Sequence, residues 1–571
     1  MLYIALLTLL LFLSYFFFAL QAFKRQLRGM QQGGYQFEPY VELVKAQRKA
    51  KTEGMWVLVA SIAINLLARD ALPILYYYLL HILAFTVLGL AHLRGKKEPG
   101  PVLDLRMTRL IAAGILLFLL LLLALGLLFR RTFWWELPFV VTFLGFFSDI
   151  WILLANALLR PLENRKVDNR LQAAGTVMTE LAKQRADAGK PPLITVGVSG
   201  SMYQTNFIEL LGQLMETRSQ VLRPQPGKAV TPESVEALIR EKLSASHDLL
   251  LVEIASTRPG DVRRFCAQLQ PDLGVITGVA EGGISGFATP ALAAEAHMEL
   301  ADCLRGREGL LALNYADEQL RKQKAEGLPL MRYGLHQGGG TPSHLDIWAA
   351  DADFGLDGTR FTLYAKGQPA LACRIALPGS LSLLHCVGAA GLALRLGMTP
   401  DELVPALAAL APREGFLRLL PAGQWPAGLE PLPAPARRRE EAEAEWPDSL
   451  RILDDSRQKT LEGAKDSLGV LRDCQGPRIL LTPGLKGQGE QEEEFNRRLG
   501  RQAARCCDQM VVIGKDAVSA IADGAGRAGF AGDDVHPALD LKDALAKASA
   551  LAQEAAAGNR PVYLLALGQF D

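Results

Sequence analysis

A glycine-rich segment carries the clearest chemical signal in the chain. It reads Gly197-Val198-Ser199-Gly200-Ser201-Met202-Tyr203-Gln204-Thr205. The apolar run before it, Leu193–Val198, predicts a buried strand, and Asn206–Arg218 has apolar residues at helical spacing. A strand, a glycine-rich turn and a helix together form a cradle for phosphate, because backbone N–H groups and a helix N-terminus face the anion.

This segment lacks the cation of a working nucleotide-binding loop. Such a loop places a lysine on the β- and γ-phosphates, after a glycine that lets the backbone come close. Those positions hold Gln204 and Tyr203, so a neutral amide and a bulky phenol replace the charge and the space. Thr205 is retained, either as a hydroxyl ligand for Mg²⁺ or as a helix cap. Together with Gly200 and Ser201, Gln204 and Thr205 are the candidate nucleotide-contacting residues of the loop.

Other candidate residues lie on later predicted elements. Glu253 lies near the end of the predicted strand 249–254, where it could bind a metal ion or be satisfied by the protein itself. His297 lies in a predicted helix, either as a metal ligand or, as we prefer, as an exposed helix residue. His385 is predicted to be a buried polar residue of the helix 383–396.

Four charged residues open the last predicted α/β unit of the chain. They are Asp454, Asp455, Arg457 and Lys459. The two cations could bind an anionic ligand, such as a substrate, beside the carboxylates. They could equally form surface ion pairs, which contribute little to stability.

The composition bounds the functional classes. The 571 residues are enough for about four domains of ~150 residues each. The 61 Lys and Arg residues balance the 60 Asp and Glu residues, so nothing indicates a nucleic-acid partner. The seven cysteines show no metal-binding spacing and fit a reducing compartment.

The N-terminal region, residues 1–160, is apolar enough to predict a transmembrane helical region of about five spans. The predicted spans are Leu2–Phe23, Met55–Ala68, Leu72–Leu93, Met107–Phe129 and Trp134–Leu159. Basic residues cluster after the first and third spans, which places the N-terminus outside and the soluble domains in the cytoplasm. A multi-pass protein of the cell membrane is therefore predicted. If the short segment Met55–Ala68 does not cross the membrane, four spans remain. The distribution of basic residues then no longer follows the positive-inside rule.

The rest of the chain alternates strands and helices, which predicts parallel sheets with crossover helices. Residues 161–190 are a polar helical connector, and 191–420 form a first α/β domain. Residues 421–447 are rich in proline and charge and are predicted to be an exposed insertion. Residues 448–571 form a smaller C-terminal α/β domain.

This order of segments resembles the Mur ligase family. The more specific resemblance is to the membrane-anchored form of the UDP-N-acetylmuramoyl-tripeptide–D-alanyl-D-alanine ligases. Leu27–Tyr35, Pro161-Leu162-Glu163 and Ile479–Gly484 carry it, beside the glycine-rich loop. The resemblance implies a phosphate-loop α/β domain and a smaller α/β domain. It also implies ATP and Mg²⁺ as cofactors and a UDP-linked muropeptide precursor that is phosphorylated on a carboxylate before an amine attacks.

Compared with the family pattern, the charge-handling positions have changed. Glu253 matches the family's Mg²⁺-binding glutamate. The family's metal-site Asn and His positions hold Gly278 and Gly283, and the lysine that bridges metals falls at His297.

Further along, the family's Pro-Gly-x-His-Asn motif is Pro378–Ser382, without the His or the Asn. Asn314 and Asp317, after the third strand, are retained as nucleotide-site candidates by the same resemblance.

These losses lead to two main hypotheses. Removing one charge-stabilising donor typically lowers a rate by ~10²–10³, so several absences together predict a catalytically impaired pseudoenzyme. It would scaffold or bind a muropeptide precursor or other cell-wall synthesis proteins. The alternative is an active ATP-dependent ligase with remodelled nucleotide and metal handling. A third interpretation is a membrane bundle that handles a lipid-linked precursor, with the ligase fold as its sensor.

Overall fold

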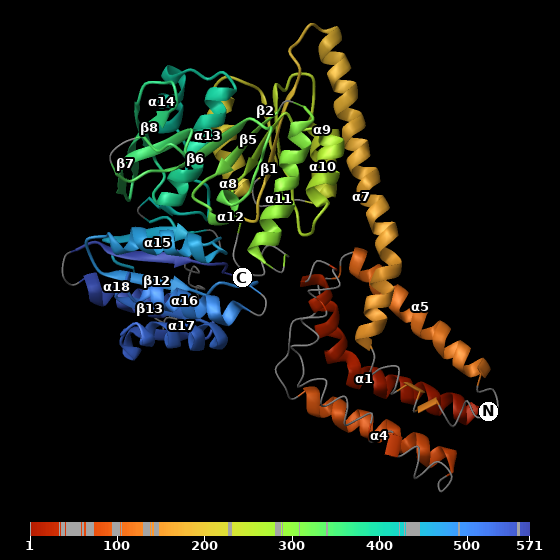
Figure 1. Ribbon diagram of the computed structural model, residues 1–571. Coiled ribbons are helices and arrows are strands. Elements are labelled where there is room, and N and C mark those ends of the chain that lie inside the picture. The colour runs from red at the N-terminus through yellow and green to blue at the C-terminus, as the bar shows by residue number, and fades with distance from the viewer. Residues whose placement is uncertain are drawn as a thin grey trace, which may run out of the picture. The chain divides into compact units, whose positions relative to one another are not determined.

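Figure 1 shows a computed structural model of the chain. The structure describes residues 2–32, 35, 40, 59, 62–63, 73–93, 103, 105–128, 137–138, 140–141, 148–225, 231–279, 287, 289–307, 309–338, 341–421, 423–426, 429, 446–488, 491–556 and 560–570. The chain forms two compact units, Met1–Val167 and Asp168–Asp571, and each is described by itself.

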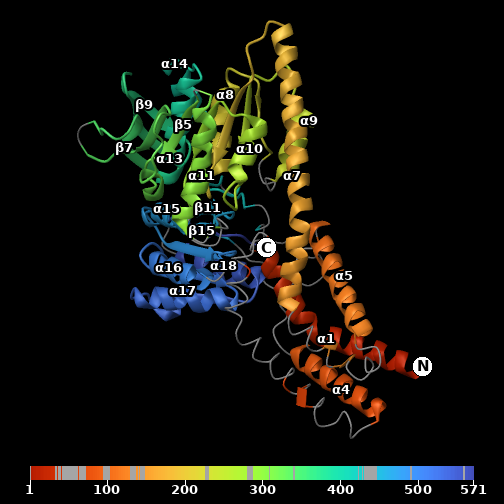
Figure 2. The same ribbon diagram turned by 45° about the vertical axis from the view of Figure 1, so that its right-hand side comes forward.

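The first unit is helical. Its main helices are α1 (Leu2–Gln32), α4 (Ile74–Leu93), α5 (Leu105–Leu128) and the first part of α7 (Ser148–Asp187). Helices α1 and α4 lie side by side in Figures 1 and 2 and share an apolar core. In this core Phe18 stacks on Phe85, with ring centroids 5.9 Å apart. Helices α1 and α4 pack together because each presents apolar side chains to the other.

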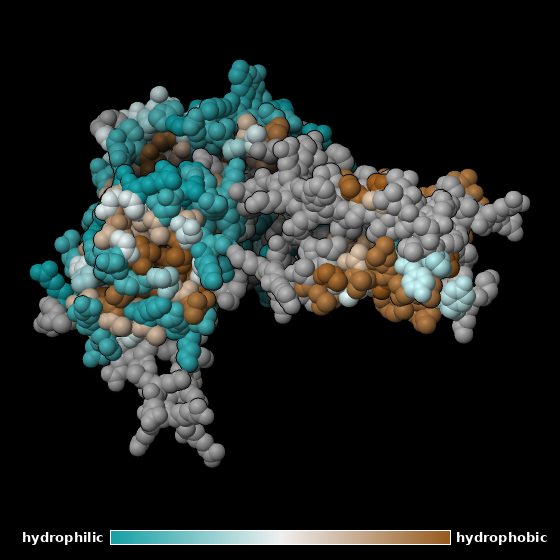
Figure 3. All heavy atoms as spheres, turned by 90° about the horizontal axis from the view of Figure 1, so that it is seen from below, coloured by the Kyte–Doolittle hydropathy of each residue, from teal (hydrophilic) through white to brown (hydrophobic). Residues whose placement is uncertain are grey.

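The outer face of this unit is strongly apolar. Leu119, Leu123 and Leu127 of α5 are all more than half exposed, and Figure 3 shows brown, hydrophobic atoms gathered over this part of the molecule. Among the described residues, α5 is the one helix both long and apolar enough to cross a membrane.

The other predicted spans have mixed outcomes. The apolar stretches within α1 and α4, Leu6–Phe18 and Ile74–Val87, are shorter than a span. Met55–Ala68 lies mostly outside the described residues. The multi-span membrane region therefore stays a prediction.

Helix α7 runs across the predicted boundary between the membrane region, residues 1–160, and the connector, residues 161–190. It contains 40 residues, with Pro161 inside it, and at 1.5 Å per residue it is about 60 Å long. A proline inside a helix removes one backbone hydrogen bond and commonly kinks or ends the helix, but α7 continues through Pro161. The predicted boundary at residue 160 consequently falls within a continuous helix.

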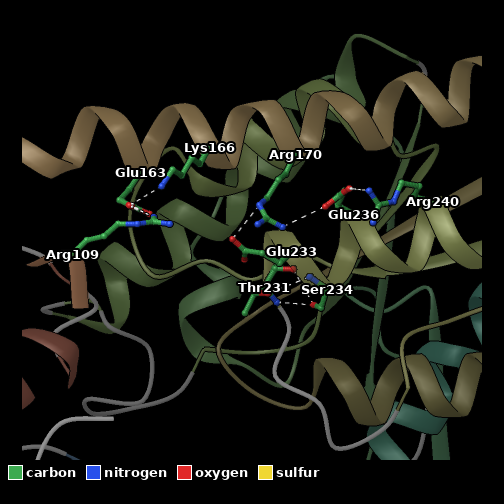
Figure 4. Close-up of polar contacts among 9 residues, drawn as sticks. All are labelled: Arg109, Glu163, Lys166, Arg170, Thr231, Glu233, Ser234, Glu236 and Arg240. Atoms are coloured by element: carbon green, nitrogen blue, oxygen red, sulfur yellow. Dashed lines mark hydrogen bonds and ion pairs between the residues drawn. The ribbon is translucent and has the colours of Figure 1, made fainter. Parts of the chain in front are cut away.

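Ion pairs along α7 hold its two halves to the units to which they belong (Figure 4). In the first unit, Arg109 of α5 lies 2.7 Å from Glu163, to which Lys166 also pairs. In the second unit, Arg170 pairs with Glu233 and Glu236 of α9 (Pro232–Lys242) at 3.5 and 3.4 Å.

The C-terminal end of α7 is fastened by a buried guanidinium. Arg185 is 1% exposed and donates to the carbonyl oxygens of Pro191 and Ala245 at 2.8 and 3.0 Å. It also donates to the carbonyl oxygen of His247 and to the carboxylate of Asp248. One side chain therefore closes the turn that leads into the first strand.

The central domain carries one large sheet. Within the described residues the order is β2-β3-β1-β4-β5-β6-β7-β8-β9, parallel up to β7 and antiparallel from β7 to β9. The strands are β1 (Ile194–Ser199), β2 (Val221–Leu222), β3 (Leu249–Glu253), β4 (Leu273–Ile276), β5 (Leu310–Asn314), β6 (Leu330–Leu335), β7 (Ile347–Gly355), β8 (Gly358–Ala365) and β9 (Leu371–Ile375).

Helices cover both faces of this sheet. They are α8 (Gln204–Glu216), α9, α10 (Asp261–Leu269), α11 (Pro290–Arg305), α12 (Glu318–Arg321), α13 (Ser380–Arg395) and α14 (Pro400–Ala408). Val196 and Val198 of β1 share a core with α8 and α13. The alternate residue Ser199 points the other way, to α11, as the two-residue period of a strand requires.

The C-terminal domain has a second sheet. In the described part of the chain its order is β10-β11-β15-β12-β13-β14. The strands are β10 (Arg418–Leu419), β11 (Leu450–Asp455), β12 (Arg478–Thr482), β13 (Gln509–Ile513), β14 (Val535–Ala538) and β15 (Val562–Leu567). Helices α15 (Leu461–Arg472), α16 (Glu492–Ala503) and α17 (Lys515–Arg527) share one core with the sheet, and α18 (Leu541–Ala556) shares another. Because β10 pairs with β11, this domain begins slightly before the predicted boundary at residue 420.

Replacement of Arg185 by methionine should destabilise the second unit. The change leaves the carbonyl groups of Pro191 and His247 without the Arg185 donor, and an unsatisfied buried polar group costs about 1–3 kcal/mol. We expect the midpoint of urea unfolding, followed by circular dichroism, to fall by the equivalent of about 2 kcal/mol. Arg170→Met is the matched control, because its guanidinium is 43% exposed and exposed pairs contribute about 1 kcal/mol or less. Equal losses in the two variants would contradict this account of Arg185.

Candidate functional site

The glycine-rich loop connects β1 to α8, as the sequence predicts. Its last residue, Tyr203, precedes the helix with φ of +63°. This left-handed conformation suits glycine and costs other residues roughly 1–2 kcal/mol. Ser201 N–H donates to the carbonyl oxygen of Gly278 at 2.9 Å, and the hydroxyl of Thr277 donates to that of Met202 at 2.6 Å. The loop is therefore held against the end of the neighbouring strand, β4.

The amide that replaces the lysine is used within the loop. Gln204 Nε2 donates to the carbonyl oxygen of Gly200, four residues earlier. Gln204 therefore offers no positive charge to an anion, and its donor is already bonded. Of the four candidate nucleotide-contacting loop residues, the structure brings Gly200 and Gln204 together in this way.

His297 is buried beneath the loop, and our expectation of an exposed helix residue is wrong. It is 0% exposed, with Nδ1 at 2.9 Å from Ser199 Oγ and Nε2 at 3.2 Å from Ser201 Oγ. The reason is helical spacing: Ala293, His297 and Leu300 lie on the buried face of α11. Burial lowers the pKa of His297 to about 4, so the ring is neutral and donates with one nitrogen while it accepts with the other.

Thr205 and Glu253 lie together, as a metal site would require. Thr205 Oγ1 donates to Glu253 Oε2 at 2.9 Å. Glu253 is 9% exposed, and burial raises its pKa above the usual range for a glutamate. Among the described residues, no group of three His, Cys, Asp or Glu side chains could hold a metal ion. Gly283, at the family's histidine position, lies outside the described residues.

ATP with Mg²⁺ does not fit the residues that surround this loop. The phosphate position has no lysine, the neighbouring amide is bonded to its own loop, and burial raises the pKa of the carboxylate at the metal position. Charge neutralisation on transferring phosphates is the main contribution of such sites to catalysis. We therefore assign no catalytic step to this site.

Asn314 and Asp317 stabilise the chain around the loop. Asn314 Nδ2 donates to the carbonyl oxygen of Thr277 at 2.9 Å. One carboxylate oxygen of Asp317 caps α12, and the other accepts from the N–H of Val279 at 2.7 Å. Their predicted role in nucleotide binding stays a prediction, while their structural role is clear.

The four charged residues at the end of β11 and just beyond it fall into two groups. Asp454 is fully buried and accepts from Gly415 N–H at 3.0 Å and from Arg418 Nε at 3.1 Å. Asp455 is also 0% exposed. Arg457 and Lys459, in contrast, are exposed, so the aspartates belong to the interior and the two cations remain available to an anionic ligand.

A hydrogen-bonded chain runs from Tyr203 to Asp455. Tyr203 Oη lies 2.9 Å from Thr460 Oγ1, and Thr460 Oγ1 donates to Gln458 Oε1 at 2.9 Å. Gln458 Nε2 then donates to Asp455 Oδ2 at 3.3 Å. An amide oxygen accepts only, so the single proton of Thr460 is committed to it and Tyr203 is the donor to Thr460. The sequence did not single out Thr460 or Gln458, because the contact joins residues 257 positions apart.

Beside this chain lies a small cavity of about 30 Å³, enough for about two water molecules. Polar groups of His385, Asp455 and Arg413 line it. Among the described residues, both ring nitrogens of His385, Asp455 Oδ1 and Arg413 Nε have no hydrogen-bond partner. The prediction of a buried His385 is confirmed, and Arg413 was missed because no motif marks it.

The sequence of the chain is similar to known proteins of one family. A family model described as the Mur ligase middle domain matches residues 198–393. UDP-N-acetylmuramoyl-tripeptide–D-alanyl-D-alanine ligase from Mycobacterium leprae is 25% identical over 232 residues, which are 38% of this chain and 43% of that protein. The central part of the chain thus matches the Mur ligase family, and within that family it is MurF-like.

A second relative shows a similar level of identity. The Escherichia coli ligase of the same name is 22% identical over 278 residues, 48% of this chain and 54% of that protein. The matches thus span about half the length of these curated relatives.

Solved structures show the same fold. MurF from Acinetobacter baumannii superposes with a TM-score of 0.55 at 17% identity, covering 70% of this chain and 77% of that one. MurF ligase from Thermotoga maritima in complex with ADP gives 0.52 at 16% identity, covering 70% and 80%.

The stability of the second unit should depend on pH through Asp455. Burial raises the pKa of this carboxyl from 3.8 to about 7. Between these pKa values the folded protein holds a proton that the unfolded chain releases, so the stabilising contribution of Asp455 is full below about pH 4, falls as pH rises to about 7, and is lost above that. At 1.36 kcal/mol per pKa unit the fall amounts to about 4 kcal/mol.

The measurement is the free energy of urea unfolding from pH 4 to pH 8, in wild type and in Asp455→Asn. The variant cannot ionise at this position, so wild type should lose this stability relative to the variant as pH rises, and the difference removes the opposite contributions of His297 and His385. The exposed Asp473 supplies the control, Asp473→Asn, which should behave as wild type. A fall of unchanged size in Asp455→Asn would show that another group is responsible.

Proposed function

We propose that the chain is a catalytically impaired, MurF-like protein of the cell membrane that binds a cell-wall precursor or partner without ATP-driven ligation. The observation that carries the proposal is the loop at Tyr203 and Gln204. There the chain's own side chains take the place of both the space and the charge that a nucleotide phosphate needs.

The electrostatics of the loop support this proposal. A triphosphate brought to the helix N-terminus of α8 would meet the helix dipole, worth about 0.3–1 kcal/mol at an exposed end, without a lysine to add to it. It would also have to displace the phenol of Tyr203 from its hydrogen bond with Thr460. Both effects disfavour binding of ATP.

The ligand class comes from the relatives. Proteins named UDP-N-acetylmuramoyl-tripeptide–D-alanyl-D-alanine ligase match the central part of the chain, and the name describes a UDP-linked muropeptide substrate. We propose that this chain recognises the same class of precursor. Arg457 and Lys459, both exposed beside the buried aspartates, are the residues we propose for its anionic groups.

The membrane part of the proposal rests on α5 and on the apolar face around it. Several leucines along α5 are exposed. A bilayer would remove their side chains from water, which is favourable by about 25 cal/mol per Å² of apolar surface. We propose that residues 1–160 anchor the protein in the cell membrane as a multi-pass region, with the soluble domains in the cytoplasm. This arrangement would keep the ligase fold near other cell-wall synthesis proteins and raise their effective concentration.

A second function is favoured by one observation. Thr205 and Glu253 lie 2.9 Å apart, and they are the two groups that the resemblance assigns to Mg²⁺. If Glu253 were ionised by an incoming metal ion, the chain could be an active ATP-dependent UDP-N-acetylmuramoyl-peptide ligase with a remodelled site. The MurF ligase from Thermotoga maritima, whose structure contains ADP, shows that the fold accommodates a nucleotide.

Isothermal titration calorimetry separates these two functions. Full-length protein in detergent is titrated with Mg-ATP, and a MurF enzyme serves as the parallel control. Because the loop lacks its cation, we expect no saturable heat below millimolar nucleotide for this chain. A micromolar dissociation constant would refute the proposal in favour of the remodelled enzyme.

Complementation tests whether the metal position matters in the cell. In a strain that lacks the native gene, Glu253→Ala should support growth as well as wild type, because no metal-dependent step is proposed. Glu253→Gln, which keeps an acceptor for Thr205, controls for folding. Leu119→Arg with Leu123→Arg should remove the protein from the membrane fraction and reduce growth. Loss of growth with Glu253→Ala, in a protein that is folded and in the membrane, decides for the active ligase.

A further inference from the structure

The central and C-terminal domains of the second unit are joined at a helix N-terminus. Asp466 of α15 accepts from the N–H groups of Ser380 and Leu381 at 2.8 and 3.1 Å, and from Ser380 Oγ at 2.6 Å. Ser380 begins α13, a helix of 16 residues in the other domain. A helix N-terminus attracts anions because its first N–H groups have no partner within the helix. Here the C-terminal domain provides that anion from its own chain.

The backbone is shaped for this contact. Gly379, which precedes α13, has φ of +87°, and a Cβ atom built there would lie 2.4 Å from Asp466 Oδ2. Any side chain at this position would therefore push the carboxylate away from the helix. The close approach of the two domains depends on a glycine in a conformation that other residues adopt with strain.

The second contact joins the same domains through the glycine-rich loop. The hydroxyl of Tyr203 donates to Thr460, which precedes α15 and also caps it by accepting from Gly463 N–H at 3.1 Å. Thr460, Gln458 and Asp455 form the hydrogen-bonded chain described above. Both contacts end on α15 or on the residue before it, so α15 is the element that the central domain holds.

We propose that Tyr203 with Thr460, and Asp466 with the N-terminus of α13, form an intramolecular latch that holds the two domains together in the absence of nucleotide. The inference rests on the proposed function, because a site that still used ATP would have to release the tyrosine. The latch gives the protein one fixed presentation of Arg457, Lys459 and the surrounding surface to a precursor or partner.

The two contacts differ in strength. A neutral hydrogen bond contributes about 0.5–1.5 kcal/mol and one to a charged group about 1.5–3 kcal/mol. Loss of the Tyr203 hydroxyl should therefore shift the ratio of joined to separated domains about fivefold. Loss of the Asp466 charge should shift it more, by at least about tenfold. The double change should shift it by about the product of the two, if the contacts act independently.

The distance between spin labels measures this ratio directly. One label is placed at Gln368→Cys in the central domain and one at Ser519→Cys in the C-terminal domain, both exposed positions, in full-length protein with Cys303→Ser. The variants are Tyr203→Phe, Asp466→Asn and both together. Tyr364→Phe removes a tyrosine hydroxyl far from the contacts, on β8, and is the matched control.

Wild type and Tyr364→Phe should give a single narrow distance without nucleotide. Tyr203→Phe and Asp466→Asn should add a longer, broader population, largest in the double variant. A broad distribution in wild type overturns the latch even if the variants fail to fold. So does a folded double variant with the wild-type distribution.

Mg-ATP provides the remaining arm of the experiment. If micromolar Mg-ATP changes the distance between the two spin labels in wild type, the proposed function is refuted. The narrow distance in nucleotide-free protein tests the latch separately from that result.

Discussion

Buried polar groups at the carboxyl ends of the two parallel sheets must find hydrogen-bond partners, because an unpaired buried group costs several kcal/mol. In an enzyme that binds a nucleotide, such groups gather where the ligand will lie. In this chain they bond to one another. His297 is held between two serines, Gln204 bonds to its own loop, and Glu253 accepts from Thr205. The loop, the metal position and the domain interface are all consequences of this internal pairing.

Three residues with incompletely paired polar atoms lie at the domain interface. His385, Arg413 and Asp455 keep polar atoms that have no partner among the described residues, and all three line the same small cavity. Burial raises the pKa of Asp455 and lowers that of His385 to about 3. Each group favours its neutral form because no opposite charge pairs with it. Some polar atoms at the interface therefore remain without a hydrogen-bond partner among the described residues.

The sequence predicted the sheets well, because buried parallel strands are recognisable as short apolar runs between helical patterns. Strands β1 and β3 agree to within one residue with the predicted strands 193–198 and 249–254, and Tyr203 and Gln204 were found from their positions in the loop. Burial was harder to predict. His297 was expected on the surface, since one polar residue on an amphipathic helix gives no sign of the serines beneath it. Contacts between domains, such as Asp466 with Ser380, have no signal in a single sequence because they join residues 86 positions apart.

The backbone conformation of Tyr203 determines which side chains the loop can carry without a change of fold. Its left-handed conformation is the one that a glycine would adopt without strain, so the main chain of the loop has kept a phosphate-binding shape while its side chains have filled it. Such a loop is separated from an empty cradle by side-chain atoms alone. A glycine at this position would therefore open the loop without any change to the path of the backbone.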